Sequence, residues 1–157
     1  MIERNVPSAG EETGTAAAIP VLLIGFGNGP CRRLRSILMA PQWEIREAPT
    51  CGQAAGMLAG GHVGVAICDT ESGGDQWRSL LAELQGADAP NLIFTSRLAD
   101  ERLWAEVLNL GGYDLLVQPF DRTEVLRVTH MAWVAWRERC QGLIARPEGA
   151  LQMRAVS

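Results

Sequence analysis

The sequence predicts an α/β fold, a doubly wound sheet of five parallel strands in the order 2-1-3-4-5 with helices on both faces. Two observations lead to this prediction. Short apolar runs alternate with segments of helical spacing from residue 19 onward, which is the rhythm of βα units around a parallel sheet. Three of the five runs are almost continuously apolar, as strands covered on both faces must be.

The five predicted strands differ in how they alternate. They are VLLIGF from Val21, WEIREA from Trp43, VGVAIC from Val63, NLIFT from Asn91 and YDLLV from Tyr113. The second run alternates between apolar and polar residues, so we expect it nearer an edge of the sheet. With right-handed crossovers, the carboxyl ends of all five strands lie at one edge, where a site is expected. This arrangement is flavodoxin-like.

Signals for the ends of helices support the same division. Thr50 is placed to cap the second helix, and Asp121 with Glu124 three residues later forms an Asp variant of the capping box before the fifth. The glycine pairs at 60–61 and 111–112 stand where helices must end and the chain must turn into the third and fifth strands. We therefore expect the second and fifth helices to follow these caps.

Composition restricts the class of protein. The chain has 157 residues, 47% hydrophobic and 20% charged, which is typical of one globular domain. A net charge of −4 argues against nucleic-acid binding. No apolar run is long enough to span a membrane, and no signal peptide is evident. We expect a cytoplasmic protein with a flexible leader at 1–18, one domain at 19–139 and a tail at 140–157.

The cysteines do not indicate a metal site. The chain holds Cys31, Cys51, Cys68 and Cys140 at irregular spacing, with no C-x-x-C pair and only two histidines. This pattern is typical of free, buried thiols in a reducing compartment rather than of zinc ligands.

Polar side chains follow three neighbouring strands. Asp69 comes directly after VGVAIC, Thr95 ends NLIFT, and Gln118-Pro119 follows YDLLV. These three features, in register with five βα units, resemble the receiver domain of two-component response regulators over about residues 20–139. The resemblance implies that Asp69 corresponds to the phosphoacceptor, that Thr95 corresponds to the switch hydroxyl, and that Gln118 and Pro119 stand where the family has its phosphate-contacting Lys-Pro.

The sequence departs from the family at two charged positions and at one aromatic position. The family holds a divalent metal with two acidic residues after the first strand, but here no Asp or Glu occurs between Val21 and Trp43. A hard cation needs several oxygen ligands and charge compensation, so we expect no cofactor, and at most weak Mg²⁺ binding at Asp69. Gln118 replaces the lysine and brings no charge to a phosphoryl group. Leu115 replaces the aromatic switch residue.

Three residues at this edge have alternative interpretations. Glu71 either supplies a second, compensating carboxylate to the Asp69 pocket or is an exposed loop residue. Asp69 is either a phosphoacceptor or a structural carboxylate bound by loop amides. Thr95 either contacts phosphate or caps the following helix.

A glycine-rich segment offers a different function. Gly25-Phe26-Gly27-Asn28-Gly29 lies between a strand and a helix, and Glu47 follows about twenty residues on, as in a dinucleotide fingerprint. However, Pro30 takes the place of the third glycine and removes an amide that would face a pyrophosphate. Small-ligand or nucleotide binding by this loop is therefore the less favoured hypothesis.

The last helix carries two apolar stripes, although a helix packed only on a sheet needs one. The second stripe holds Leu126, Trp133 and Trp136, and Trp104 lies on the preceding helix. Tryptophan is a preferred anchor residue in interfaces, so we expect an interaction surface here, unless Trp133 or Trp136 packs under the tail.

Together these observations predict a non-enzymatic, receiver-like signalling module that binds a protein partner or a histidine kinase, with Asp69 phosphorylation impaired or absent. A homodimer through the fourth and fifth helices is one form of that interaction. The alternative is a single-domain receiver in which Asp69 accepts a phosphoryl group in a phosphorelay.

Overall fold

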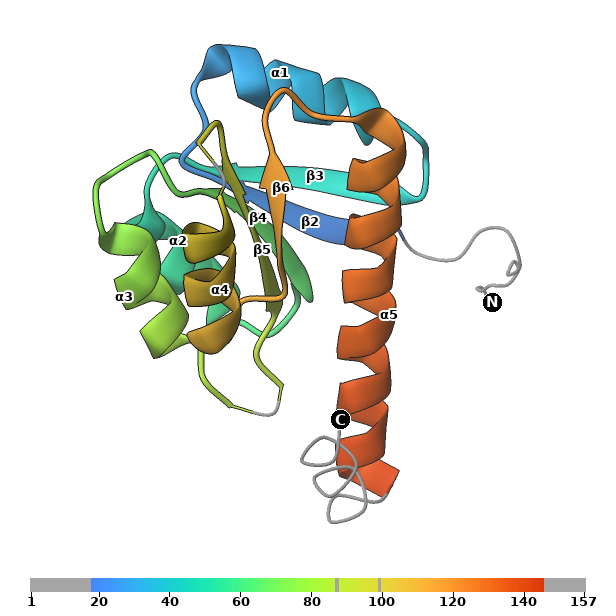
Figure 1. Cartoon of the computed structure of the whole chain (residues 1–157). Coiled ribbons are helices and arrows are strands. Elements are labelled where there is room, and N and C mark those ends of the chain that lie inside the picture. Colours follow the sequence, from blue (N-terminus) through green and yellow to red (C-terminus); the bar gives the residue numbers. More distant parts are fainter. Residues whose placement is uncertain (1–17, 87, 99, 146–157) are drawn as a thin grey trace.

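The computed structural model describes residues 18–86, 88–98 and 100–145; the predicted leader up to residue 17 and the predicted tail from residue 146 lie outside the described residues. The five strands form one parallel sheet in the order β3-β2-β4-β5-β6. Numbered along the chain, that order is 2-1-3-4-5, so the predicted topology is confirmed. Figure 1 shows the sheet with helices on both of its faces.

The strands have the burial that their sequences predict. They are β2 (Ile19–Ile24), β3 (Trp43–Ala48), β4 (Val65–Asp69), β5 (Asn91–Ser96) and β6 (Asp114–Val117). Every residue of β5 is buried, and only the last residue of β4 is partly exposed. The strand β3 exposes part of its length and lies at an edge, as its alternating pattern predicts.

Helices cover the sheet in two groups. They are α1 (Asn28–Ile37), α2 (Cys51–Leu58), α3 (Gln76–Glu83), α4 (Glu101–Asn109) and α5 (Arg122–Ala145). Alternate residues of β2 divide between two cores: Val21 and Leu23 face the core under α1 and α5, whereas Leu22 and Ile24 face the core under α2, α3 and α4. This alternation is what period-two side-chain placement requires.

The helix starts and stops follow the predicted signals. Thr50 Oγ1 accepts a hydrogen bond from Gln53 N at 3.2 Å, and Asp121 Oδ2 accepts one from Glu124 N at 2.9 Å. Gly61 and Gly111 adopt φ angles of 78° and 104°, a backbone conformation that side chains disfavour. Each of these glycines ends a helix and turns the chain back toward the sheet.

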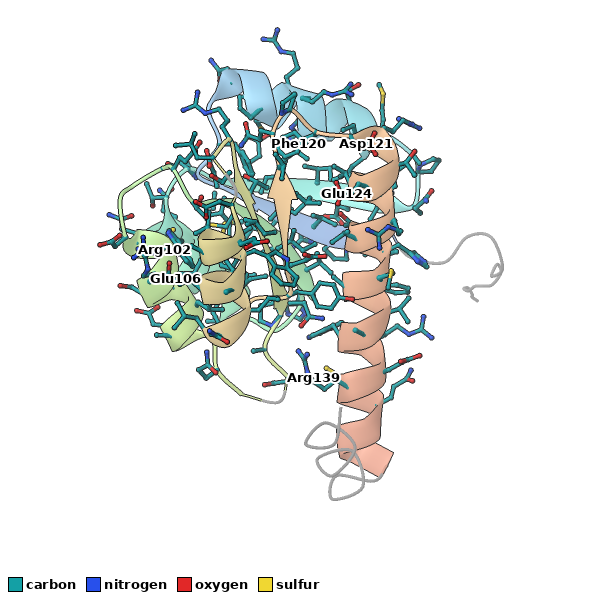
Figure 2. The ribbon with its side chains drawn as sticks, viewed as in Figure 1. Arg102, Glu106, Phe120, Asp121, Glu124 and Arg139 are labelled. Atoms are coloured by element: carbon teal, nitrogen blue, oxygen red, sulfur yellow. The ribbon has the colours of Figure 1, made fainter. Side chains whose placement is uncertain are left out.

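The helix α5 passes the predicted domain boundary at residue 139 and runs to Ala145. The Trp136 indole lies over Gly64, the residue before β4, where an added Cβ would lie 2.3 Å from the ring. Its Nε1 donates to Asp88 O at 3.1 Å. Arg139, which Figure 2 shows on the side of α5 that faces the sheet, donates to Asn91 Oδ1 at 3.0 Å. These contacts attach α5 to the amino-terminal ends of β4 and β5.

Candidate functional site

Three of the predicted site residues lie together at the carboxyl edge of the sheet. Asp69 and Thr95 are register partners at the ends of β4 and β5. Gln118 N donates to Ser96 O at 3.0 Å, and Gln118 Nε2 donates to Thr95 Oγ1 at 3.2 Å. The expectation that these side chains share one edge is confirmed. Thr95 is fully buried, and Asp100 rather than Thr95 caps α4 by accepting from Leu103 N at 2.9 Å.

The turn after β6 contacts the segment that leads from β2 into α1. The Gln118–Pro119 peptide bond is cis, and Phe120 follows it into the core shared with α5. The Phe120 ring packs edge-on against Phe26, with centroids 6.3 Å apart, and its carbonyl accepts a 3.4 Å hydrogen bond from Arg33. Figure 2 shows Phe120 in the turn between β6 and α5. The segment after β2 therefore reaches the same edge as Gln118.

The Asp69 carboxylate is partly exposed, and one of its two oxygens accepts a hydrogen bond. Its Oδ1 accepts a 3.0 Å hydrogen bond from Glu71 N. Burial is the main cause that raises the pKa of Asp69 above its usual range, and the negative charge of Glu71 raises it further. The hydrogen bond from the Glu71 amide and the positive charge of Arg97 act to lower this pKa. Within the described part of the chain, Oδ2 has no hydrogen-bond partner. One oxygen is thus available to a ligand.

Glu71 does not offer a second free carboxylate to this pocket. Its Oε2 accepts from Ser96 Oγ at 3.0 Å and from Arg97 N at 3.2 Å, and its Oε1 accepts from Arg97 Nε at 3.0 Å. Burial acts to raise the pKa of Glu71, but the hydrogen bonds from Arg97 and Ser96 outweigh it and lower that pKa. Glu71 lies exposed in the loop after β4, as one of the two predicted alternatives has it, although its side chain, held by Arg97, is only 23% exposed. Glu71 is a bound partner of Arg97.

The loop after β2 borders Asp69 without supplying charge. The pairing of Ile24 with Cys68 places Gly25 next to Asp69 across the sheet. Gly25 has a φ of 77°, and a Cβ there would lie 3.2 Å from Ser72 Oγ. Among the described residues no group of three or more His, Cys, Asp or Glu side chains could hold a metal ion. The donor set around Asp69 does not fit Mg²⁺, which prefers several oxygen ligands.

Comparison with solved structures identifies the fold. The receiver domain of an HD-domain protein from Pseudomonas fluorescens Pf-5 matches with a TM-score of 0.67 and 24% identity, covering 77% of this chain and 98% of that one. A receiver domain from Vibrio parahaemolyticus, of a putative Luxo repressor protein, matches with a TM-score of 0.71 and 13% identity, covering 79% and 96%. This chain has the receiver-domain fold.

A third receiver structure was determined with bound ligands and a partner. The CheX–CheY–BeF3–Mg²⁺ complex from Borrelia burgdorferi matches with a TM-score of 0.65 and 20% identity, covering 73% of this chain and 89% of that chain. No protein-family model matches the sequence, and no curated protein matches it. The likeness to receivers is therefore one of fold, and the departures at the carboxyl edge have to be interpreted from this chain's own residues.

Leu115, which stands where the resemblance to receivers leads one to expect an aromatic residue, belongs to the core. Leu115 is 7% exposed and packs in the core under α2, α3 and α4. It also lines a groove of about 340 Å³ between α4 and β6, together with Asp100, Glu101, Trp104 and Val117. Trp104 and Val117 are each 49% exposed. The groove is therefore apolar, with two acidic residues at the start of α4.

The four residues of the predicted interaction surface do not share one role. Trp104 is exposed on α4, whereas Leu126 packs against the core under α1 and α5. Trp133 is partly buried, and the Arg137 guanidinium stacks on its ring at 4.9 Å. Trp136 differs most from its predicted role, because it covers Gly64 and bonds to the main chain before β5. Among the described residues its partners belong to the sheet end, and the alternative that Trp133 or Trp136 packs under the tail concerns residues outside the described ranges.

The contacts of Glu47 do not support the alternative that this chain binds a nucleotide. Glu47, the residue predicted to bind a ribose, forms an ion pair with Arg35 of α1. The Arg35 hydrogen bond, aided by one from Cys31, lowers the pKa of Glu47. In the receiver fold this carboxylate therefore joins α1 to β3.

Sequence reasoning missed the partner of Glu71 and a thiol pair. Arg97 follows Thr95-Ser96 directly, and a basic residue there was the only available signal that the Glu71 carboxylate would be bound. Cys51 and Cys68 are buried in the same core cluster, and their separation of seventeen positions gave no motif that would reveal it.

No helix within the described ranges is both long and apolar enough to cross a membrane.

Proposed function

We propose that this chain is a receiver-like signalling module of a two-component or phosphorelay pathway, which acts by binding a protein and in which phosphorylation of Asp69 is impaired. It performs no reaction of its own and has no resident cofactor. The receiver fold supports the signalling context, and the charges around Asp69 support the loss of phosphoryl chemistry.

One observation carries the proposal: the Glu71 carboxylate is bound to Arg97 and Ser96 instead of being open to a ligand. Among the described residues at this edge, Asp69 is then the one carboxylate left for a metal, and the neutral amide of Gln118 hydrogen-bonds to Thr95. Phosphoryl transfer depends on positioning and on charge stabilisation by metal and cation. A pocket with a single carboxylate and no cation at Gln118 supplies little of either.

The apolar groove between α4 and β6 is the surface that suits a partner. Trp104 provides a half-exposed aromatic ring that lines the groove with Leu115, and Asp100 and Glu101 add negative charge to its lining. Aromatic anchors beside polar rims are typical of binding hot spots. The CheX–CheY complex is a protein assembly of a receiver of the same fold, and we expect this chain to act by such an assembly too.

Intact mass spectrometry tests the proposal. The wild-type protein and Asp69→Asn are incubated with Mg²⁺ and acetyl phosphate, and the fraction carrying one added phosphoryl group is followed with time. We expect little or no gain in either protein. A rapid gain in the wild type that is absent from Asp69→Asn would overturn the proposal.

That outcome would favour the second candidate, a receiver that still accepts a phosphoryl group at Asp69. The observation in its favour is that Asp69 is partly exposed and that Oδ2 has no hydrogen-bond partner among the described residues, so an oxygen is free for attack.

A further inference from the structure

A groove lies between α1 and the edge strand β3. Its volume is about 490 Å³, and Arg32, Arg35, Ser36, Leu38, Met39, Trp43 and Ile45 line it. Met39 is 81% exposed, more than any other large apolar side chain that the structure describes. Trp43 and Ile45 add apolar surface from the strand side. The α1–β3 groove therefore combines open apolar surface with arginine side chains.

The charged residues that line this groove are cations. Arg35 forms an ion pair with Glu47. The Arg32 guanidinium is exposed, and within residues 18–86, 88–98 and 100–145 it has neither an ion-pair nor a hydrogen-bond partner. A guanidinium binds a carboxylate through charge-assisted hydrogen bonds. The groove thus suits a segment that carries both carboxylates and apolar side chains.

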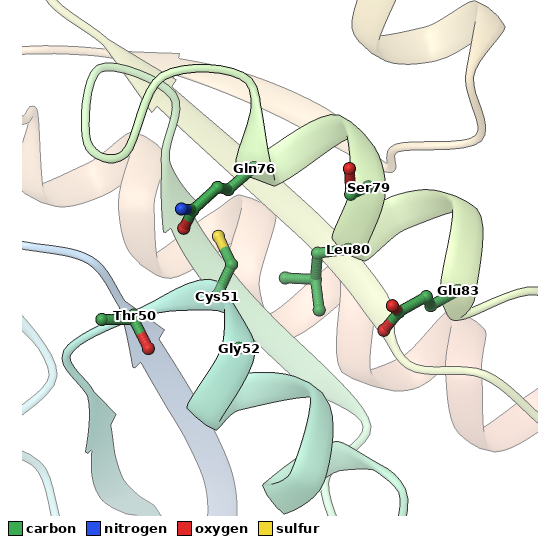
Figure 3. Close-up of a pocket in the computed structure, with 7 residues that line it drawn as sticks. All are labelled: Thr50, Cys51, Gly52, Gln76, Ser79, Leu80 and Glu83. Carbon is green, nitrogen blue, oxygen red and sulfur yellow. The ribbon is translucent and has the colours of Figure 1, made fainter.

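Three other hollows on the described surface carry the opposite charge. Glu83 is the charged residue that lines the cleft between α2 and α3, which Figure 3 shows. Glu47 is the charged residue of a hollow beside α2. Asp100 and Glu101 line the groove between α4 and β6. Like charges repel, so of these four hollows the α1–β3 groove is the one that attracts an acidic segment.

The amino-terminal segment, residues 1–17, has the matching composition. It lies outside the described residues. It holds three glutamates against one arginine, and two of the glutamates, Glu11 and Glu12, are adjacent. It also contains Ile2 and Val6. Negative charge and apolar side chains are the two properties that the α1–β3 groove complements.

The chain enters the sheet beside this groove. Ile19, the first residue of β2, is the register partner of Trp43. The helix α1 ends six positions before Trp43, and Arg32 lies about 8 Å from that end along the helix axis. Residue 18 stands six positions after Glu12, and six residues reach up to about 20 Å when extended. Glu12 is therefore within reach of the Arg32 guanidinium.

The strand β3 also has one open side. Gln42 O accepts a hydrogen bond from Ile19 N of β2 at 2.6 Å, and Ala48 O accepts one from Gly25 N at 2.9 Å. Main-chain groups point alternately to the two sides of a strand, so those of Ile45 point to the open edge. Native proteins commonly cover such edges.

We propose that the amino-terminal segment docks in the α1–β3 groove, with the carboxylates of Glu11 and Glu12 on Arg32 and an apolar side chain on Met39. The docked segment covers the exposed methionine and the edge of β3, and so closes this surface to a second chain. This inference does not depend on the proposed function, because it involves neither Asp69 nor the groove between α4 and β6.

Zero-length cross-linking tests the contact, because the chain contains no lysine. In full-length Arg32→Lys the introduced ammonium is the one side-chain amine. A carbodiimide joins an amine to a carboxylate that touches it, with loss of water. The cross-linked monomer is isolated, and chymotrypsin cuts between the amino-terminal segment and α1. We expect linked peptides that join position 32 to Glu11 or Glu12.

Arg102→Lys, which places the amine on α4, is the matched control and should give no link to residues 1–17. A link from position 32 to Glu44 or Glu47 alone would refute the docking, and so would the absence of any link. A link to Glu11 or Glu12 found only in a covalent dimer would refute it too, because a second copy would then occupy the groove.

Hydrogen exchange provides a measurement without a cross-linker. Arg32→Glu should speed exchange of the Ile45 amide by up to about fivefold, the range that an exposed ion pair contributes. Adding Glu11→Arg and Glu12→Arg to that variant restores the opposite charges and should restore slow exchange. Arg102→Glu is the control and should match the wild type. The same Ile45 rate in wild type and Arg32→Glu would contradict the proposal.

Discussion

The Gln118 side-chain amide donates a 3.2 Å hydrogen bond to the buried hydroxyl of Thr95. This contact joins the ends of β5 and β6 next to Asp69, which is the register partner of Thr95. A neutral donor therefore lies where the resemblance to receivers leads one to expect a lysine. The first prediction follows from replacing it.

Gln118→Lys should increase phosphorylation of Asp69 by acetyl phosphate. The ammonium group would provide a charge-assisted contact to the transferring group, worth about 1.5 kcal/mol or roughly tenfold in rate. Initial rates from intact mass spectrometry measure the effect, and Gln118→Met is the control of similar size without charge. Equal rates for the lysine and methionine variants would show that the missing charge is not what limits the reaction.

Asp69→Asn should raise the melting temperature at pH 7. The folded pKa of Asp69 is raised, chiefly by burial, so the stability contributed by its neutral form is complete below the unfolded pKa and is lost as the pH rises through the folded pKa. Asparagine keeps the oxygen that accepts from Glu71 N and carries no charge. Calorimetry across pH should show the difference between the two proteins vanish below about pH 3.5. A wild type that is the more stable protein at pH 7 would contradict this.

Gly64→Ala should destabilise the fold by about 1–3 kcal/mol, because the new methyl group would overlap the Trp136 ring. Trp136→Ala should cost about 2 kcal/mol through lost packing. In the double variant the methyl group has room, so the two costs should not add. Urea denaturation of the four proteins gives the coupling energy, and strict additivity would show that the ring is not held against Gly64.

Trp104→Ala should change assembly and leave stability nearly unaltered. The side chain is 49% exposed, so its loss should alter unfolding free energy by less than about 1 kcal/mol. If two copies associate through the groove between α4 and β6, the dimer dissociation constant should rise by tenfold or more. Sedimentation equilibrium measures it. Met39→Ala, an exposed apolar residue on the α1 side, is the matched control. A wild type that stays monomeric at high concentration would contradict the homodimer.

The order of the strands and the meeting of Asp69, Thr95 and Gln118 could be predicted because parallel strands bring their carboxyl ends to one edge. Caps at Thr50 and Asp121 could be predicted because each bonds within three residues. The binding of Glu71 by Arg97 could not, since it joins two loops 26 positions apart. The same is true of Trp136, whose side of α5 faces Gly64 only because of how that helix lies across the sheet.

The sequence by itself determined which residues lie at the carboxyl edge and which charges are missing there, because both follow from strand periodicity and from the identity of single residues. Only the tertiary structure decided that Arg97 binds the Glu71 carboxylate and that Trp136 supports the sheet. Each of those facts is a contact between distant segments, set in one case by how the loops after β4 and β5 meet and in the other by how α5 lies across the sheet, which local patterns do not encode.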